Sequence, residues 1–176
     1  IAGDFTCKGY EEFQDYYSKK VRKVYCWRDN PHGVQTLRNA LCNSCNPAYM
    51  QLGARIGTAT LYKYYDAFGL FETTGSGLYG EQSSIFHKLD EVKPIDLATM
   101  SFGQRFTITP LQMVTAISCI ANDGILMKPR IVKQVINTDT GTITEVETST
   151  VRQVISKQTA QEVKSIMESV VTEGTG

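Results

Sequence analysis

The sequence lacks an excess of charge of either sign, a long apolar run and any internal repeat, and these absences limit the classes of protein it can encode. Its 18 Lys and Arg residues balance 18 Asp and Glu residues, so no strong field attracts nucleic acid or an anionic lipid surface. No stretch approaches the ~18 consecutive apolar residues of a membrane span. With 41% hydrophobic and 20% charged residues, the chain has the composition of a globular domain or of a piece of one.

The sequence also lacks an initiating methionine and a signal peptide. It begins with IAGDF and ends with TEGTG, so both termini look cut. We therefore expect an excised segment whose targeting sequence lies upstream.

Histidine is scarce, with only two residues, whereas there are five cysteines: Cys7, Cys26, Cys42, Cys45 and Cys119. The Cys42-x-x-Cys45 spacing is compatible with zinc, and Cys7 and Cys26 are possible further ligands. A zinc module usually shows a second close pair of Cys or His, and here both histidines stand alone in the sequence. We therefore predict no metal and no cofactor, and interpret Cys42 as a buried small hydrophobe. Cys7 and Cys26 are candidates for a disulfide if the compartment is oxidising.

The first 35 residues show no clear periodicity, and we expect an irregular segment there, with short extended pieces such as KVRKVYCW. Its basic residues are interpreted as a solvated face rather than a binding patch: Lys19, Lys20, Arg22 and Lys23. From Thr36 onward helical signals dominate. Thr36 is expected to cap a helix that runs to Asn43, and Asn46 followed by Pro47 predicts the N-cap and first position of a helix that stops at Gly57.

Further helices are predicted from Thr58 to Gly69, over PIDLATM, and after Thr109, whose capping box is completed by Gln112. Residues 72–94 are expected to form a long loop. PRIVKQVIN and TITEVE predict an antiparallel hairpin, and Ser156 is expected to cap a long amphipathic final helix. These patterns predict a mainly α fold with a small β-hairpin.

Ser44 and Asn46 lie in the turn between two predicted helices. In an extended turn their side chains would point the same way, and a hydroxyl beside a carboxamide can relay a proton and position a substrate. The simpler interpretation of the tripeptide alone is helix capping, because S-x-N is too short to be specific.

The surroundings of this tripeptide carry a more specific signal. The stretches NSCNPAYMQLGARIG, YYDAFGL, TTGSGLYGE and ATMSFGQRFTITPLQMVTAISCIANDGILMKP occur in this order. Together they resemble the transpeptidase domain of class B penicillin-binding proteins over most of the chain. The early part resembles the sporulation and cell-division members from Gram-positive bacteria.

The resemblance implies the helical-subdomain portion of the penicillin-binding protein and β-lactamase-like transpeptidase fold, truncated at both ends. Residues 1–176 would be a partial transpeptidase domain: an irregular part at 1–35, a helical subdomain at 36–128, and a hairpin and helix of the α/β subdomain at 129–176. Ser44 would relay a proton, and Asn46 would hold the catalytic lysine and the donor peptide. Gln104 either lies near the cleft and binds substrate or braces its loop.

The other two motifs of such enzymes, S-x-x-K and K-T-G, are absent from the sequence. The family would place them before residue 1 and after residue 176. The parent is thus expected to be a serine D,D-transpeptidase that cross-links peptidoglycan stem peptides and is inhibited by β-lactams, whereas this chain alone is expected to be inactive. The alternatives are a β-lactam sensor or β-lactamase relative, and a non-catalytic scaffold that binds division or sporulation proteins.

The resemblance also implies a location on the extracytoplasmic face of the cell membrane, with an anchor upstream. Disulfides persist there, so Cys7 and Cys26 remain a candidate pair. The expected partners are stem peptides, β-lactams for the parent only, and division or sporulation membrane proteins. No nucleic acid is expected, and apolar surface left on the hairpin or last helix would favour a dimer.

Overall fold

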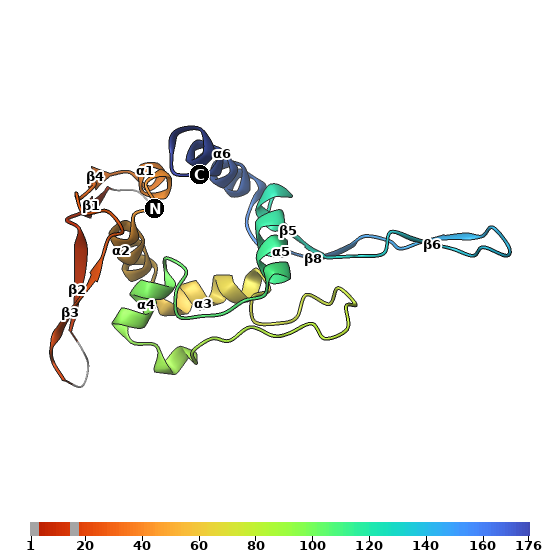
Figure 1. Cartoon of the computed structure of the whole chain (residues 1–176), viewed down its shortest axis with the longest axis horizontal. Helices are drawn as coiled ribbons and strands as arrows, with labels where there is room; N and C mark the ends of the chain where they lie inside the picture. Colours follow the sequence, from red (N-terminus) through yellow and green to blue (C-terminus); the bar gives the residue numbers. More distant parts are fainter. Residues whose placement is uncertain (1–3, 15–17) are drawn as a thin grey trace. The chain divides into compact units, whose positions relative to one another are not determined.

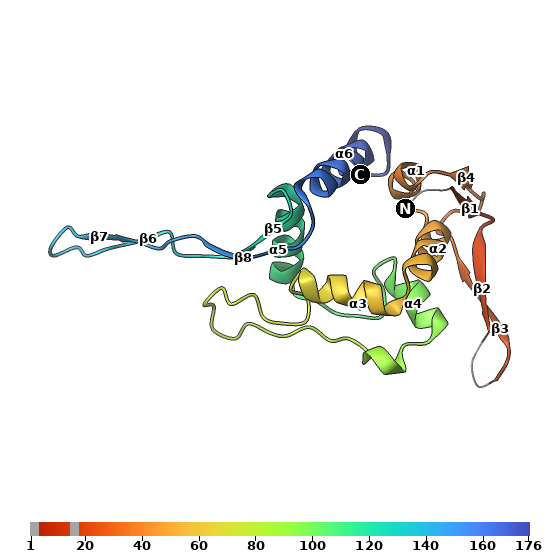
Figure 2. The ribbon, with the colours of Figure 1, turned by 180° about the vertical axis from the view of Figure 1, so that it is seen from behind.

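The computed structural model describes residues 4–14 and 18–176, which form two compact units. Unit 1 consists of Ile1–Tyr64, Phe86–Thr107 and Glu162–Gly176, and unit 2 of Tyr65–Ile85 and Ile108–Gln161. Figures 1 and 2 show their elements from opposite sides. Each unit combines helices with two-stranded sheets, so the fold is more mixed than the mainly α expectation. Within the described ranges no helix is both long and apolar enough to cross a membrane.

The N-terminal part of unit 1 contains four strands, which corrects the expectation of a largely irregular segment over 1–35. One of them, Val21–Tyr25, lies within the predicted extended piece KVRKVYCW. Strand β1 (Phe5–Cys7) pairs antiparallel with β4 (Gly33–Gln35), and β2 (Tyr10–Gln14) pairs antiparallel with β3 (Val21–Tyr25). Most side chains of β3 are exposed. A polar strand of this kind lacks the strong apolar alternation by which strands are recognised.

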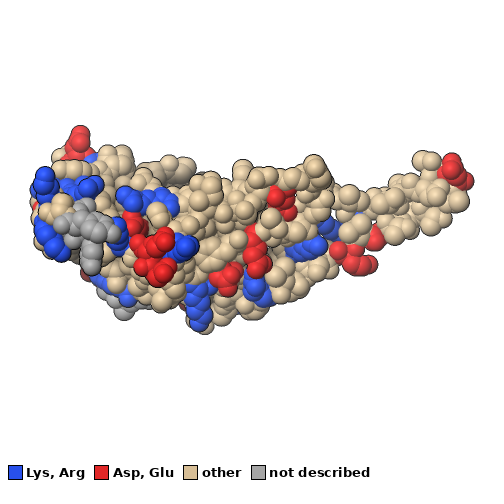
Figure 3. All heavy atoms as spheres, turned by 90° about the horizontal axis from the view of Figure 1, so that it is seen from below, with Lys and Arg blue, Asp and Glu red and all other residues tan. Residues whose placement is uncertain are grey.

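Lys and Arg side chains gather at the end of unit 1 that holds the β2–β3 hairpin, coloured blue in Figure 3. The four basic residues of the expected solvated face are all exposed. Lys23 also lies 3.5 Å from Glu12 on the neighbouring strand and 4.1 Å above the Tyr10 ring. The basic side chains therefore follow the surface of this hairpin and interact with its own residues.

The helices at 37–67 and 94–100 and the last helix begin and end close to where the sequence predicts. Helix α1 (Leu37–Cys42) starts at Thr36, whose hydroxyl accepts from the Asn39 N–H. Helices α2 (Asn46–Ile56) and α3 (Thr58–Ala67) follow, and the loop after α3 contains only the 3₁₀ turn η1 (Leu89–Glu91) before α4 (Pro94–Met100). The last helix, α6 (Lys157–Glu173), begins after Ser156, whose hydroxyl accepts from the Thr159 N–H.

Strand β1 is attached to helix α2 by side chains from both elements. The Gln51 carboxamide accepts from the Thr6 N–H at 3.2 Å and donates to the Thr6 carbonyl at 2.7 Å. Arg55 donates to the Asp4 carbonyl and lies 4.3 Å from the centre of the Phe5 ring. Phe5 is fully buried, in a core cluster with four other side chains: Cys7, Ala40, Cys45 and Ala48.

Unit 2 is organised around helix α5 (Pro110–Ala121) and a two-stranded sheet. The Thr109 and Gln112 capping box is present as predicted. The buried Gln112 side chain also donates to the carbonyls of Leu70 and Glu72, at 3.2 and 2.7 Å, so it ties the preceding loop to the helix. Strand β5 (Ile125–Lys128) pairs antiparallel with β8 (Ser149–Gln153).

The predicted hairpin is confirmed as β6 (Gln134–Ile136) paired antiparallel with β7 (Ile143–Glu145). It continues the β5–β8 pair outward as a long ribbon (Figures 1 and 2). Val135, Ile136 and Ile143 are more than half exposed, as expected for the hairpin. The dimer that such a surface would favour remains a prediction.

Helices α2 and α4 approach closely at Gly53. A Cβ atom built at this position would lie 2.7 Å from the Ser101 Cβ and 2.9 Å from its Oγ. Real Cβ atoms do not approach other carbon atoms so closely, and the obstructing atom is fixed to the backbone at the end of α4. Glycine is therefore required at position 53 for contact between the two helices.

We predict that Gly53→Ala destabilises the chain by about 1–3 kcal/mol through overpacking, although the same change in an exposed helix stabilises by up to about 1 kcal/mol. Urea unfolding of four proteins tests this: the original, Gly53→Ala, Ser101→Gly and the double variant. Because Ser101→Gly removes the obstructing Cβ, the double variant should recover most of the loss. Increased stability in Gly53→Ala alone would contradict the close approach.

Candidate functional site

The turn between α1 and α2 carries the two predicted catalytic residues, and its geometry differs from the expected extended turn. Ser44 has a φ of 49°, in the left-handed region. Its N–H donates to the Leu41 carbonyl at 3.0 Å, and the Cys45 N–H donates to the Ala40 carbonyl at 2.9 Å. These two bonds form a Schellman motif, which satisfies the last carbonyls of α1. Ser44 thus occupies the position at which helices usually place glycine or asparagine.

The Ser44 side chain is exposed. Among the described residues its hydroxyl has no hydrogen-bond partner. A serine in the left-handed region costs about 1–2 kcal/mol relative to glycine, and here no hydrogen bond of its own hydroxyl offsets that cost. Helix capping therefore does not account for this serine, because glycine would form the same turn with less strain.

Asn46 is the first residue of α2, and Cys45 rather than Asn46 is the N-cap. The Asn46 carboxamide does not cap the helix. Its Nδ2 instead donates across the turn to the carbonyl of Tyr25, the last residue of β3, at 3.4 Å. On the same side, the Trp27 indole donates to the Asn43 carbonyl at 2.9 Å. Residues 25–27 therefore lie alongside the S-x-N turn.

Gln104 follows α4 and is exposed, and its N–H donates to the Thr99 carbonyl at 3.0 Å. Next to it, the Arg105 guanidinium donates to the buried Asp96 carboxylate. The Asp96 carboxylate also accepts from the Lys93 N–H at 3.0 Å. This ion pair fixes the loop that carries Gln104, whereas the role of Gln104 in substrate binding stays a prediction.

A groove of about 820 Å³ in unit 1 does not include Ser44, Asn46 or Gln104. It lies between the β2–β3 hairpin and the start of α4. Its walls come from Phe13, Gln14, Arg22, His87, Asp90, Glu91, Val92, Lys93, Pro94, Ile95, Asp96 and Arg105. The S-x-N turn and Gln104 therefore do not line this groove.

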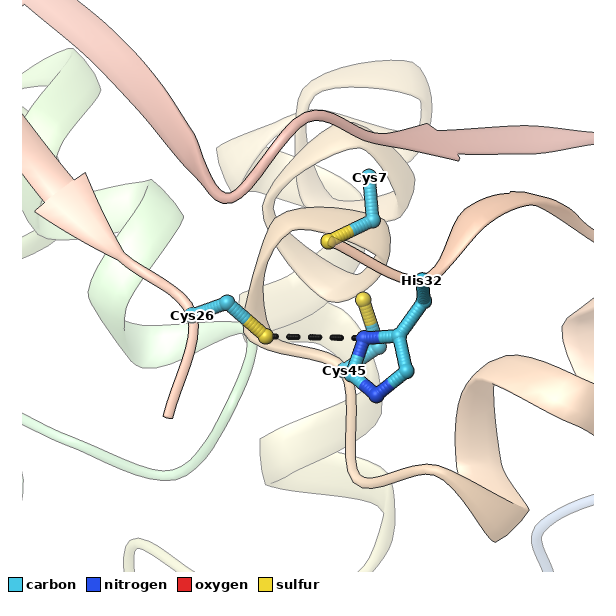
Figure 4. A group of neighbouring side chains, drawn as sticks. All are labelled: Cys7, Cys26, His32 and Cys45. Atoms are coloured by element: carbon cyan, nitrogen blue, oxygen red, sulfur yellow. Dashed lines mark hydrogen bonds between the residues drawn. The ribbon is translucent and has the colours of Figure 1, made fainter. Parts of the chain in front are cut away.

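Directly behind the S-x-N turn, four side chains point into one space (Figure 4). They come from the end of β1, the residue after β3, the residue before β4 and the N-cap of α2: Cys7, Cys26, His32 and Cys45. Their ligand atoms all lie within 4.8 Å of one another. The Cys26 Sγ lies 3.6 Å from the His32 Nδ1.

Burial and local hydrogen bonds give these groups different acidities. Burial raises the pKa of the Cys45 thiol to about 12. Burial also acts to raise the pKa of Cys7, but hydrogen bonds from the backbone N–H groups of His32 and Gly9 and from the neighbouring thiols lower it overall. The pKa of His32 is lowered by burial and by the nearby Arg28, so its imidazole is neutral at neutral pH.

Sequence reasoning identified Cys7 and Cys26 as neighbours but missed His32, which stands alone in the sequence. It also paired Cys45 with Cys42, whereas Cys42 lies in α1 and outside this group. All five cysteines fall in the described part of the chain and are free thiols there. The Cys7–Cys26 disulfide therefore remains a prediction that the proximity of the two residues permits.

Comparison with known proteins shows a match to one domain family over nearly the whole chain. The family pattern described as the penicillin binding protein transpeptidase domain matches residues 6–176. Stage V sporulation protein D of Bacillus subtilis is 40% identical over 155 residues, which are 88% of this chain and 24% of that protein. Penicillin-binding protein PbpB of Mycolicibacterium smegmatis is 35% identical over 142 residues, 80% of this chain and 22% of that one. The chain thus spans about a quarter of the length of these relatives.

Solved structures agree with the sequence comparison. Penicillin binding protein 3 from Mycobacterium tuberculosis, in complex with aztreonam, superposes with a TM-score of 0.83 and 29% identity over 100% of this chain and 39% of that one. A D,D-transpeptidase domain from Eggerthella lenta gives a TM-score of 0.86 and 26% identity over 98% of this chain and 44% of that one.

The left-handed conformation of Ser44 yields a stability prediction. Ser44→Gly should be more stable than Ser44→Ala by about 1 kcal/mol, because alanine keeps the strain that glycine relieves. Ser165 is a matched control, since it is exposed within helix α6. There the order should reverse, with the glycine variant less stable by about 1 kcal/mol. Urea unfolding of the four variants measures both differences, and an alanine at position 44 as stable as glycine would contradict the assigned turn.

Proposed function

The chain belongs to the penicillin-binding protein transpeptidase family, and from this premise we propose that it is the middle part of a serine-type D,D-transpeptidase that cross-links peptidoglycan stem peptides. The observation that carries the proposal is the S-x-N turn. It holds an exposed serine in a strained conformation, beside an asparagine that is not used for capping. Several relatives are named peptidoglycan D,D-transpeptidases, including PbpA of Mycolicibacterium smegmatis, which is 32% identical over 139 residues.

In this proposal Ser44 relays a proton and Asn46 positions its neighbours. A hydroxyl both donates and accepts a hydrogen bond, so Ser44 passes a proton between the lysines of the two other motifs and the departing amine of D-alanine. The Asn46 carboxamide donates through Nδ2 and accepts through Oδ1, which suits it to hold a lysine ammonium and a peptide group together. Proton transfer and positioning of this kind contribute factors of roughly 10² to 10⁴.

Gln104 is proposed to contact the donor peptide from the loop after α4. The Asp96–Arg105 ion pair beside it holds the loop in place, and the Gln104 side chain is exposed and available for hydrogen bonds. Its role is that of a binding residue, because a carboxamide neither gains nor loses a proton near neutral pH.

The remaining proposals concern the longer protein. It would act on the extracytoplasmic face of the membrane, where stem peptides are cross-linked, and would be acylated by β-lactams at a serine of an S-x-x-K motif. Membrane proteins of division or sporulation are its proposed partners. These proposals rest on family membership, and the chain itself contributes the S-x-N turn to them.

We predict that a fluorescent penicillin does not label this 176-residue chain covalently. A serine without an adjacent general base has a hydroxyl pKa far above neutrality and is a poor nucleophile, and the sequence contains no S-x-x-K. Denaturing gel electrophoresis after incubation measures the label, with the longer protein as the positive control. A single labelled serine in the chain would contradict the assignment.

We predict that Ser44→Ala in the longer protein slows acylation by a labelled penicillin by roughly 10²- to 10⁴-fold, because the proton relay is lost. Ser149→Ala is the matched control, since Ser149 is exposed on strand β8 of unit 2. The Ser149→Ala variant should be acylated at the same rate as the original longer protein. Equal rates for the two variants would exclude Ser44 from the reaction, and no acylation of the original longer protein would favour a non-catalytic scaffold.

A further inference from the structure

We propose that Cys7, Cys26, His32 and Cys45 bind one Zn²⁺ ion in a closed tetrahedral site. Zinc–sulfur bonds of about 2.3 Å and zinc–nitrogen bonds of about 2.0 Å place tetrahedral ligands about 3.8 Å apart for two sulfurs and about 3.5 Å apart for sulfur and nitrogen. The Cys26 Sγ to His32 Nδ1 distance is 3.6 Å. The other pairs of ligand atoms among the four side chains also lie within 4.8 Å of one another. Only small side-chain shifts are therefore needed to bring all four atoms to bonding distance from one zinc ion.

The composition of the group selects the metal. Three thiolates and one imidazole form a ligand set found in structural zinc sites, and soft thiolate ligands disfavour magnesium and calcium. Binding replaces the three thiol protons, which pass to solvent, so Zn²⁺ with three thiolates and a neutral imidazole carries one net negative charge. All four positions are taken by protein ligands, which leaves no position for a substrate and makes the site structural.

Ordinary core packing explains only part of this arrangement. Cysteines are common in cores, and Cys7 and Cys45 belong to the apolar cluster around Phe5. Packing does not require an imidazole nitrogen to face three thiols (Figure 4). A Cys7–Cys26 disulfide likewise uses two of the four groups and gives no role to His32 and Cys45. The metal site accounts for all four.

The surroundings of the group favour an anionic metal centre. Gly9 has a φ of 95°, a conformation that glycine adopts readily and that turns the chain back after Cys7. The positive charge of Arg28 lies close enough to His32 to influence it, and it would partly offset the negative charge of the site.

The site would fasten the S-x-N turn to the strand segments behind it. Cys45 is the middle residue of the S-x-N tripeptide, and its side chain is buried while Ser44 is exposed. Cys26 lies between Tyr25 and Trp27, which bond Asn46 and Asn43 respectively. A zinc ion bound to Cys26 and Cys45 would therefore link the same two segments by a third connection. Its effect on catalysis rests on the proposed function, whereas zinc binding itself does not.

The test is the zinc content of the full chain, purified under reducing conditions and incubated with ZnCl₂. Native mass spectrometry should show one Zn²⁺ per chain, and Co²⁺ in its place should give the visible absorption of tetrahedral thiolate coordination. Cys7→Ser, Cys26→Ser, His32→Ala and Cys45→Ser should each weaken zinc binding at least tenfold in competition with a chromophoric chelator. Cys42→Ala is the matched control: it removes a buried thiol outside the group, and it should bind zinc as the original does.

Thermal unfolding gives a second measurement that needs no variant. At free zinc about 1,000-fold above the Kd, the Tm should rise by roughly 10 °C relative to the chain in EDTA. The proposal is overturned if the reduced chain binds no zinc and shows no such shift. It is also overturned if zinc binds equally well to the four ligand variants, or if the cysteines form a Cys7–Cys26 disulfide that reduction does not convert to a zinc-binding form. These outcomes are independent of transpeptidase activity.

Discussion

The left-handed turn at Ser44 reverses the chain between α1 and α2, and most features of the site depend on it. The N–H groups of Ser44 and Cys45 satisfy the final carbonyls of α1, so α2 can begin immediately at Asn46 with Pro47 in its first turn. The reversal also separates the side chains of three consecutive residues. The Ser44 side chain is exposed, that of Cys45 is fully buried, and that of Asn46 is partly buried.

Because of this turn, the tripeptide Ser44-Cys45-Asn46 presents different side chains to solvent and to the protein interior. The solvent side carries the hydroxyl and carboxamide proposed for proton transfer and substrate positioning. The buried side carries a thiol that meets Cys7, Cys26 and His32. Catalytic groups need to be held to within about half an ångström, and short turns are among the more mobile parts of a protein. The hydrogen bonds of Asn46 and Asn43 to Tyr25 and Trp27 supply rigidity that the turn alone lacks, and the proposed zinc ion would add a connection from Cys45 to Cys26.

The sequence predicts those parts of the fold that depend on neighbouring residues. The caps of Thr36, Thr109 and Ser156 are confirmed, because a hydroxyl that accepts from an N–H three residues on is a local interaction. The S-x-N motif and the family were also found from sequence, since the order of several stretches is specific.

Features that depend on distant residues were missed. Strands β1 and β4 pair across the whole intervening hairpin, and with three residues each they are too short to show a local apolar pattern. His32 lies six residues after Cys26, but it belongs to no close Cys or His pair of the kind that marks a zinc motif, and the pairing of Cys7 with Gly33 brings it beside Cys7. The Cys42-x-x-Cys45 spacing was misleading because the helix end and the left-handed turn lie between the two residues.

The central claim is that the S-x-N turn is held from behind by a metal site, and anomalous diffraction tests it most directly. Crystals of the reduced, zinc-loaded chain, measured above and below the zinc absorption edge, should show one peak. It should lie about 2.3 Å from the Sγ atoms of Cys7, Cys26 and Cys45 and about 2.0 Å from the His32 Nδ1, with Ser44 facing solvent on the opposite side of the turn. Absence of a peak among these four side chains, or a sulfur–sulfur bond between Cys7 and Cys26 in its place, would contradict the claim.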